Sequence, residues 1–286
     1  MSFYIENECS CMKFSVLLSL YFKENASYLD ACFDSIWFKQ SVKPSEIILV
    51  LDGPIGDELT QCVEKWEKVI GISLGVVPLA KNVGLGNALN EGLKYCSNEW
   101  VFRMDTDDIC KPDRFEKQIQ FIKENPEVVL FSGQILEFNE NLSDANTLKY
   151  VPTEHTDIVK FAQKRSPFNH MTVAYKNSVI GAVGGYQHHL FMEDYNLWLR
   201  VIGAGYRVGN HSDILLYARV GNGMHARRKG YEYIKSELQL LKLKKELKLQ
   251  DPIHANILFL LRSSFRLLPS SLLGKIYNTF LRKKSS

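Results

Sequence analysis

Three carboxylates stand within four residues, at Asp105, Asp107 and Asp108, directly after an apolar run that ends at Met104. Carboxylates this close repel one another unless positive charge lies between them. A divalent cation removes that repulsion, and hard oxygen ligands favour Mg²⁺ or Mn²⁺. Such a cation can also bridge to a diphosphate and take up the charge that develops as the diphosphate leaves. A solvated acidic turn or a helix N-cap is the structural alternative.

A second acidic pair, Glu193 and Asp194, opens a predicted helix. One of these carboxylates could act as a general base that takes the proton from an attacking hydroxyl. The alternative is ordinary acidic charge at a helix N-terminus, which the helix dipole stabilises.

Two further segments could contact phosphates. Asn82, Gly84 and Gly86 precede a predicted helix, and glycines there let the backbone approach a ligand, although Leu89 interrupts the dinucleotide fingerprint. In the small, basic segment 223–230, a histidine beside arginines could complete a metal shell and hold phosphates. A plain turn and a structural histidine are the respective alternatives.

Alternating strands and helices must position these residues. Apolar runs predict strands, and amphipathic spacing predicts helices between them; the strands are 14–20, 46–51, 72–79 and 100–104, and the helices are 28–39, 60–69 and 87–95. This order predicts an α/β fold with a mostly parallel sheet flanked by helices. Ligands bind outside the carboxyl ends of such strands, where both Asp52 and Asp105 fall.

The second half of the chain is less regular. The patterns predict the following elements: helices 112–123, 192–202 and 231–249, a strand over 128–138, a loop over 139–146, and a turn bracketed by 174–175 and 184–186. From residue 252 to 286 there is no Asp or Glu, and basic residues alternate with apolar ones. Such a basic amphipathic region suits an anionic membrane surface, although a helical tail packed on the core would show the same composition.

Composition is that of a globular protein. The 286 residues are 45% hydrophobic and 23% charged, and the net charge of +3 is too small to indicate nucleic acid as a partner. The six cysteines form no CxxC pairs and are typical of reduced, buried residues. The first residues have no basic segment typical of a signal peptide, and no apolar run of about 18 residues predicts a membrane-spanning helix.

Taken in order, these motifs resemble those of the family 2 glycosyltransferases, which have the GT-A fold. The resemblance covers roughly residues 13–233, and its motifs are Leu51-Asp52-Gly53, Asn82-Val83-Gly84, Arg103-Met104-Asp105-Thr106-Asp107-Asp108, Gly184-Gly185-Tyr186, and Glu193-Asp194 with Trp198 and Arg200. More narrowly, the chain is similar to bacterial transferases of the amylovoran type, which build O-antigen, capsule or exopolysaccharide repeat units. Segments 167–170 and 223–230 contribute to that narrower likeness.

The resemblance implies a role for each matched residue. The donor-binding residues would be Asp52 at uracil or ribose, Asn82 and Gly84 around the nucleotide, Asp105 at ribose or sugar, and Arg103, Asp108 and Arg228 elsewhere along the donor site. Asp107 and His225 would hold Mn²⁺ or Mg²⁺. Asp194 would be the catalytic base with Glu193 beside it, and His170 and Trp198 would face the acceptor.

The resemblance also implies a single-displacement reaction and its partners. Hexose, as glucose or galactose, would pass from a UDP-sugar to a saccharide on undecaprenyl diphosphate, with inversion at the anomeric carbon. The QxxRW motif of processive family members is missing after the acidic pair, so one sugar per acceptor is expected. The enzyme would be cytoplasmic and peripheral to the inner face of the cell membrane.

We expect three regions along the chain. Residues 1–12 would be an N-terminal extension, and 231–286 a helical, basic amphipathic region. The catalytic domain, 13–230, would divide into a nucleotide-sugar-binding half, 13–110, and an acceptor-binding half, 111–230.

Two other functions share some of these features. A metal-dependent sugar nucleotidyltransferase also uses carboxylates on an α/β sheet, but it would carry a glycine-rich loop near its N-terminus, and segment 19–25 has no glycine. A non-enzymatic nucleotide- or carbohydrate-binding module would not need Asp194.

Overall fold

A computed structural model describes residues 12–220, 231–266 and 283–284. The expected N-terminal extension, apart from Met12, and most of the predicted basic tail therefore lie outside the described residues.

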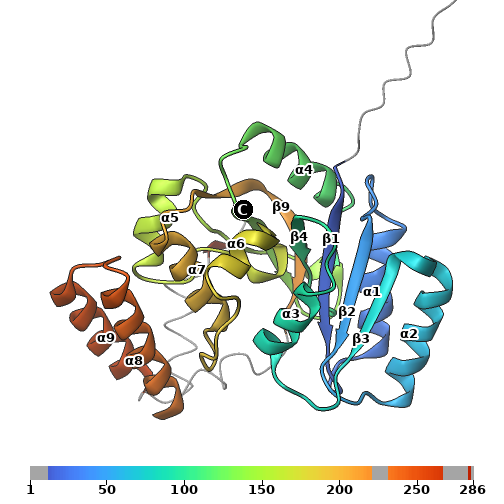
Figure 1. Ribbon diagram of the computed structural model, residues 1–286, viewed down its shortest axis with the longest axis horizontal. Coiled ribbons are helices and arrows are strands. Elements are labelled where there is room, and N and C mark those ends of the chain that lie inside the picture. Colours follow the sequence, from blue (N-terminus) through green and yellow to red (C-terminus); the bar gives the residue numbers. More distant parts are fainter. Residues whose placement is uncertain (1–11, 221–230, 267–282, 285–286) are drawn as a thin grey trace, which may run out of the picture.

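The first half of the chain alternates strands and helices as predicted. Its elements are β1 (Phe14–Leu20), α1 (Ala26–Trp37), β2 (Glu46–Leu51), α2 (Asp57–Ile70), β3 (Leu74–Pro78), α3 (Leu85–Leu93) and β4 (Trp100–Arg103), with a 3₁₀ turn at Gly71–Ser73. β1 pairs in parallel with both β2 and β4, and β2 pairs in parallel with β3. The ends of β2 and β4 therefore flank the end of β1, which confirms the expected edge for a site (Figure 1).

The second half extends the same sheet. Its elements are β5 (Ile109–Cys110), α4 (Arg114–Glu124), β6 (Leu130–Phe138), β7 (Thr147–Lys149), α5 (His155–Ala162), β8 (Ala174–Lys176), α6 (Asn177–Ala182), α7 (Glu193–Gly203) and β9 (Val208–Arg219), with 3₁₀ turns at Leu142–Asp144 and His170–Thr172. The strand order is β10-β7-β6-β8-β4-β1-β2-β3, where β10 is Lys283–Lys284, and β9 pairs with β5 and β6.

The second half contains elements that the sequence analysis did not predict, and β8 and β9 among them are part of the sheet. Between 174–175 and 184–186, where a turn was expected, the chain forms the helix α6. Just before it, β8 lies antiparallel between β4 and β6. β9, which the patterns did not identify, runs parallel to β6 over most of its length. Three residues are too few for β8 to show a period, and neighbouring strands on both sides supply its hydrogen bonds.

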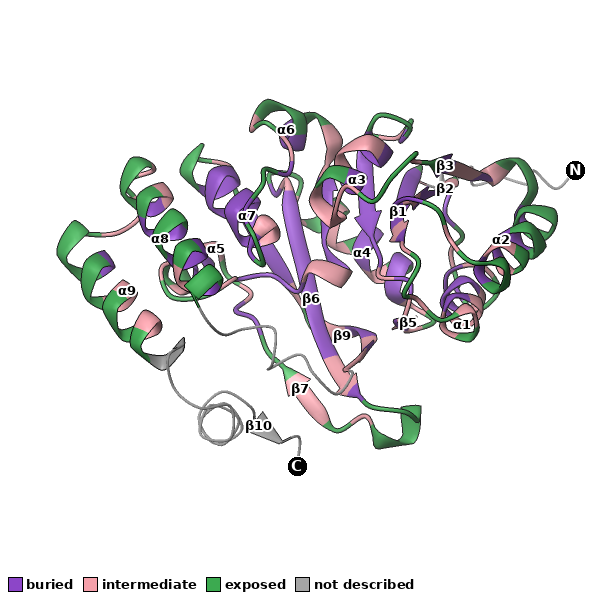
Figure 2. Ribbon diagram, turned by 90° about the horizontal axis from the view of Figure 1, so that it is seen from below, coloured by how far each residue is buried: buried purple, intermediate pink, exposed green. Residues whose placement is uncertain are grey.

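Helices cover both faces of the sheet, and β1 shows how. Leu17 belongs to one buried cluster with residues of α3 and α7, whereas Val16 and Leu18 belong to another with residues of α1, α2 and α4. Successive side chains of a strand point to opposite faces, so each face has its own core. The predicted fold, a mostly parallel sheet between helical layers, is confirmed (Figures 1 and 2).

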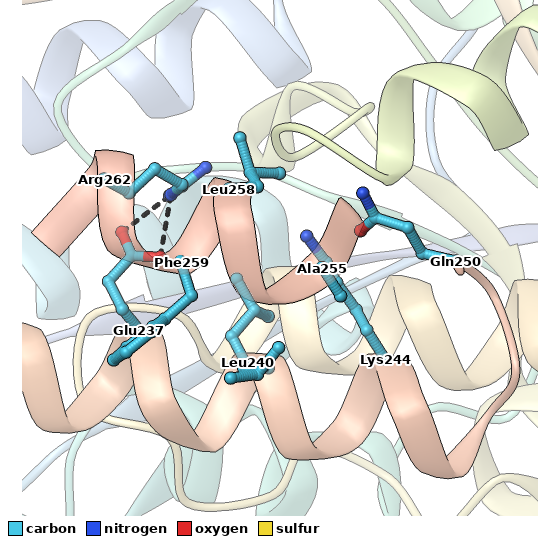
Figure 3. A pocket seen from close by; sticks show the side chains of 9 residues that line it. Glu237, Leu240, Lys244, Gln250, Ala255, Leu258, Phe259 and Arg262 are labelled. Carbon is cyan, nitrogen blue, oxygen red and sulfur yellow. Dashed lines mark hydrogen bonds and ion pairs between the residues drawn. The ribbon is translucent and has the colours of Figure 1, made fainter. Parts of the chain in front are cut away.

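Two C-terminal helices, α8 (Tyr231–Glu246) and α9 (Pro252–Arg266), form a hairpin at one end of the molecule (Figure 1). Inside it, the Arg262 guanidinium makes a bidentate ion pair with Glu237, with N–O distances of 2.7 Å (Figure 3). Burial lowers the pKa of the nearby Lys244 to about 7. Within the described part of the chain, no helix has the length and apolar character needed to cross a membrane.

Candidate active site

The Asp52 side chain holds the turn that precedes α3. Asp52 is buried, and its carboxylate accepts the backbone N–H of Val83 at 2.6 Å and that of Gly84 at 3.1 Å. Its carbonyl accepts the Asn82 side-chain amide at 3.2 Å. The structure thus brings Asp52, Asn82 and Gly84 together, and it leaves Asn82 exposed beside the turn. Their contacts with a nucleotide remain a prediction.

Gly53 is required for this close approach. Its φ is +89°, and a Cβ at this position would lie 2.6 Å from the backbone nitrogen of Asn82. Any side chain would therefore push the turn before α3 away from the end of β2.

The acidic loop follows β4 and lies beside the buried guanidinium of Arg103. Arg103, only 1% exposed, forms an ion pair with Asp105, which is half-buried. Asp107 is also half-buried, whereas Asp108 is 2% exposed and accepts the backbone N–H of Arg219 at 2.8 Å. Asp105 and Asp107 are therefore the members of this loop that are open to a ligand, and Arg103 and Asp108 support them from beneath.

Arg219 is a residue that the sequence analysis missed. At the end of β9, its Nε donates to the carbonyl of Asp107 at 3.2 Å, and its guanidinium stacks 3.8 Å from the ring centre of Tyr28. Arg219 thereby ties the acidic loop to α1. No motif marks this arginine, because only the pairing of β9 with β5 and β6 carries it to the loop.

The second acidic pair reaches the same site from α7. Glu193 and Asp194 are in the first turn of α7 and are half-buried. A Cβ built on Gly86 would lie 3.5 Å from the Glu193 Cβ, so the first turns of α3 and α7 meet. A glycine at this point of α3 leaves room for that approach.

Burial and mutual repulsion perturb these carboxyl groups. Burial, followed by the charge of Asp105, raises the pKa of Asp107 to about 6, and the same two causes raise the pKa of Asp108. Burial also raises the pKa values of Glu193 and Asp194. The positive charge of Arg103 offsets part of each of these four increases, so both acidic segments lie within the field of this guanidinium.

These carboxylates fit a divalent cation that a substrate would help to bind. Among the described residues, no three His, Cys, Asp or Glu side chains gather as a metal-binding group. Mg²⁺-type sites, however, commonly use one or two carboxylates and complete the shell with phosphate oxygens and water. The repulsion between Asp105 and Asp107 is what such a cation relieves. The predicted ligand His225 and the predicted donor residue Arg228 lie outside the described residues.

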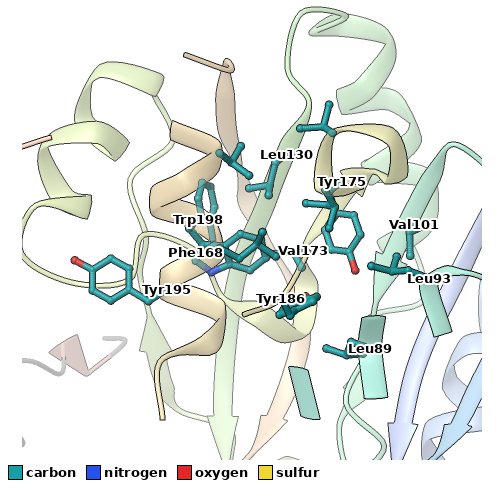
Figure 4. Packing of buried hydrophobic residues seen from close by; sticks show 14 of the residues in the cluster. Leu89, Leu93, Val101, Leu130, Phe168, Val173, Tyr175, Tyr186, Tyr195 and Trp198 are labelled. Carbon is teal, nitrogen blue, oxygen red and sulfur yellow. The ribbon is translucent and has the colours of Figure 1, made fainter. Parts of the chain in front are cut away.

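His170 and Trp198, the predicted acceptor residues, are in contact. Their ring centres are 5.8 Å apart, and the His170 Nε2 lies 2.9 Å from the Tyr186 hydroxyl. Burial lowers the pKa of His170 well below its usual range, which keeps the ring neutral. Trp198 is fully buried among Phe168 and Tyr186 (Figure 4), so it supports His170 and has no open surface of its own.

Comparisons with known proteins identify a family and relatives that match most of the chain. The family model described as Glycosyl transferase family 2 matches residues 15–181. The chain is 45% identical over 264 residues to the amylovoran biosynthesis glycosyltransferase AmsE of Erwinia amylovora, which covers 92% of this chain and 97% of the relative. It is 36% identical over 274 residues to the UDP-Gal:alpha-D-GlcNAc-diphosphoundecaprenol beta-1,3-galactosyltransferase of Escherichia coli, covering 95% of this chain and 97% of that one.

A solved structure supports the fold. The mannosyltransferase of Pyrobaculum calidifontis, in complex with GDP-Man and Mn²⁺, superposes with a TM-score of 0.65 at 18% sequence identity, covering 94% of this chain and 75% of that one. The family match and the two relatives also decide between the functions that the sequence left open, in favour of a glycosyltransferase. This chain belongs to glycosyltransferase family 2.

Proposed function

We propose that this enzyme transfers a single hexose, glucose or galactose, from a UDP-sugar to a saccharide linked to undecaprenyl diphosphate, in the assembly of a surface polysaccharide. The observation that carries the proposal is a pair of acidic segments, one after β4, where Asp105 pairs with Arg103, and one at the start of α7, where Glu193 lies against Gly86 of α3. The name of the Escherichia coli relative supports the class of donor and acceptor. The name of the Erwinia amylovora relative supports a role in polysaccharide biosynthesis.

In the proposed reaction, Asp194 takes the proton of an acceptor hydroxyl as the hydroxyl oxygen attacks the anomeric carbon. The bond between that carbon and the diphosphate oxygen breaks, and the diphosphate leaves with the electron pair. An α-linked donor therefore gives a β-linkage. A Mn²⁺ or Mg²⁺ ion, when bound by Asp107 with His225, supplies positive charge at the diphosphate.

The remaining roles are proposed for the other matched residues. Asp52 would position Asn82 and Gly84 around the nucleotide, because its carboxylate holds their turn. Asp105 would contact the ribose or sugar, with Arg103 fixing its carboxylate. Neutral His170 would face the acceptor, and Arg228 would lie at the donor diphosphate. Residues 13–230 would form the catalytic domain in this arrangement.

We further propose that the C-terminal region holds the enzyme on the inner face of the cell membrane. Residues 252–286 contain no Asp or Glu. On α9, the side chains of Ile253, Ile257, Leu260 and Leu261 are between 50% and 70% exposed. The last three follow Ile253 by four, seven and eight residues, which places all four side chains along one side of the helix. Apolar side chains in a stretch without acidic residues suit the surface of an anionic bilayer.

Nucleotide release from a panel of UDP-, GDP-, dTDP- and CMP-sugars tests the proposed function. The panel is run with and without Mn²⁺, in the presence of a lipid-linked saccharide acceptor. We expect metal-dependent release of UDP from one UDP-hexose, with the sugar recovered on the acceptor in β-linkage. Release from a GDP- or dTDP-sugar would overturn the donor, and metal-independent transfer would overturn the role of Asp107.

A further inference from the structure

Phe191 has an unfavourable backbone conformation close to the acidic pair of α7. Its φ is +67°, and among the described residues the only other non-glycine residue with a positive φ is Lys248. A side chain in this region costs about 1–2 kcal/mol relative to the right-handed conformation. Such strain persists only where the surrounding structure imposes it, and it is concentrated at functional sites.

Contacts with α8 impose this conformation. The buried His189 donates through Nε2 to the carbonyl of Ser236 at 2.8 Å, and the Ser236 hydroxyl donates to the carbonyl of Leu190 at 2.6 Å. The Gln239 side-chain amide donates to the carbonyl of His188 at 2.9 Å. Three consecutive residues before Phe191 are therefore attached to one helix.

The attachment presents an aromatic ring to solvent. Phe191 stacks on Tyr233 of α8 with ring centres 5.4 Å apart and an angle of 15° between the planes. Tyr233 is 6% exposed, whereas Phe191 is 45% exposed. One face of the Phe191 ring thus rests on a buried ring, and this support leaves the ring little freedom to move.

The position of the ring relative to the carboxylates defines its side of the site. Glu193 approaches Gly86 of α3, and α3 follows the turn that Asp52 holds on the donor side. Phe191 instead packs against α8, and α7 lies between α8 and the strands β4 and β1 (Figure 1). The first turn of α7 therefore has the Phe191 ring on one side and the turn before α3, which Asp52 holds, on the other.

We infer that Phe191 is a stacking platform for a sugar ring of the acceptor. This inference rests on the proposed function, because it requires that an acceptor saccharide reach Asp194. A pyranose has an apolar face of C–H groups, and binding sites for such ligands use aromatic side chains at fixed orientation. A platform three residues before the base would orient the acceptor hydroxyl towards Asp194, since the loop holding the ring continues directly into α7.

Replacement of Phe191 by glycine and by alanine tests the platform. Glycine adopts a positive φ without strain, which offsets part of the packing lost with the ring, so Phe191→Gly should still fold. We expect both variants to raise the KM for the acceptor about tenfold, with an unchanged dissociation constant for UDP. Phe191→Trp should restore the parental KM. Phe38→Ala is the matched control. Phe38 is also an exposed aromatic residue, at 59%, and it packs on Trp66 of α2 instead of on α8.

Two acceptors distinguish a sugar contact from a lipid contact. The same saccharide is offered on a short alkyl diphosphate and on a long polyprenyl diphosphate. An increase in KM for both supports the platform, and an increase confined to the long chain would mean that the ring contacts lipid, which overturns the inference. An unchanged KM in Phe191→Gly would overturn it as well.

Direct binding separates this inference from the proposed function. Ligand-observed NMR with the short-chain acceptor measures saccharide binding to the parent and to Phe191→Gly without turnover. A parent that binds the saccharide through Phe191 but transfers no sugar would contradict the function and leave the platform standing. A parent that transfers sugar while Phe191→Gly binds the acceptor equally well would contradict the platform alone, and a parent that neither binds nor transfers would contradict both.

Discussion

Asp194 is the carboxylate on which the proposed chemistry depends. Burial raises its pKa, while backbone N–H groups in the first turn of α7 and the charge of Arg103 counteract the increase. A carboxylate whose pKa is raised by burial is a stronger base than an exposed one, and a stronger base takes a proton from an attacking hydroxyl more readily.

Replacing Asp194 by asparagine should therefore remove the base and little else. We expect Asp194→Asn to reduce kcat by about 10²–10⁴-fold, the typical contribution of general base catalysis, and to leave the dissociation constant for UDP unchanged. Asp157→Asn is the matched control, because Asp157 is also in the first turn of a helix and is exposed. Kinetics with a defined acceptor and calorimetric titration with UDP measure both quantities. Full activity in Asp194→Asn would mean that another group takes the proton.

At the scale of the element, α9 combines two roles. Its inner side joins α8 through the ion pair between Arg262 and Glu237 (Figure 3). Its outer side leaves four large apolar side chains exposed. α9 is thus attached to α8 by this ion pair, while its free side resembles a membrane-binding surface.

Polar substitutions on the free side of α9 should weaken membrane binding without affecting the fold. Each fully buried Ile or Leu contributes about 1.5–3 kcal/mol, so Ile257→Ser with Leu260→Ser should reduce binding to phosphatidylglycerol vesicles at least tenfold. Ile72→Ser is the control, since Ile72 is fully exposed in the turn after α2. Sedimentation with anionic and with neutral vesicles measures the effect. Unchanged sedimentation of the double variant would exclude this side of α9 as the contact.

At the scale of the whole molecule, the active site should lower stability at neutral pH. The pKa values of Asp107, Asp108, Glu193 and Asp194 are all raised in the folded state. The folded state therefore binds more protons at these groups than the unfolded state does, and their contribution to stability increases as pH falls from about 6 to about 4. The site thus tolerates repulsion that substrate and cation would relieve.

The variant Asp107→Asn tests whether the carboxylates of the site lower the free energy of unfolding at neutral pH. Without divalent cations at pH 7, we expect a free energy of unfolding about 1–3 kcal/mol higher than that of the parent, because a pKa raised from 3.8 to about 6 corresponds to that range. The difference from the parent should shrink as pH falls towards 4. Urea denaturation at several pH values measures both effects, and the variant should lose metal-dependent transfer. A variant less stable than the parent at pH 7 would contradict the interpretation.

The local pattern of the sequence determined the first half of the fold and indicated the candidate residues of the site. The strands 14–20 and 46–51 have the predicted limits, because a short apolar run between turn residues is a signal that neighbouring residues provide by themselves. Asp105 and Asp194 were identified in the same way, because a carboxylate that follows a predicted strand or begins a predicted helix is recognisable from neighbouring residues alone.

The tertiary structure decided what depends on distant partners. β8 forms because β4 and β6 flank it, and Arg219 reaches the acidic loop because β9 pairs with β5 and β6. Trp198, expected at the acceptor, is buried behind His170, and Phe191 is strained because α8 holds the preceding residues. Pairing, burial and strain arise between residues far apart in the chain, and the local period of a sequence carries no information about such distances.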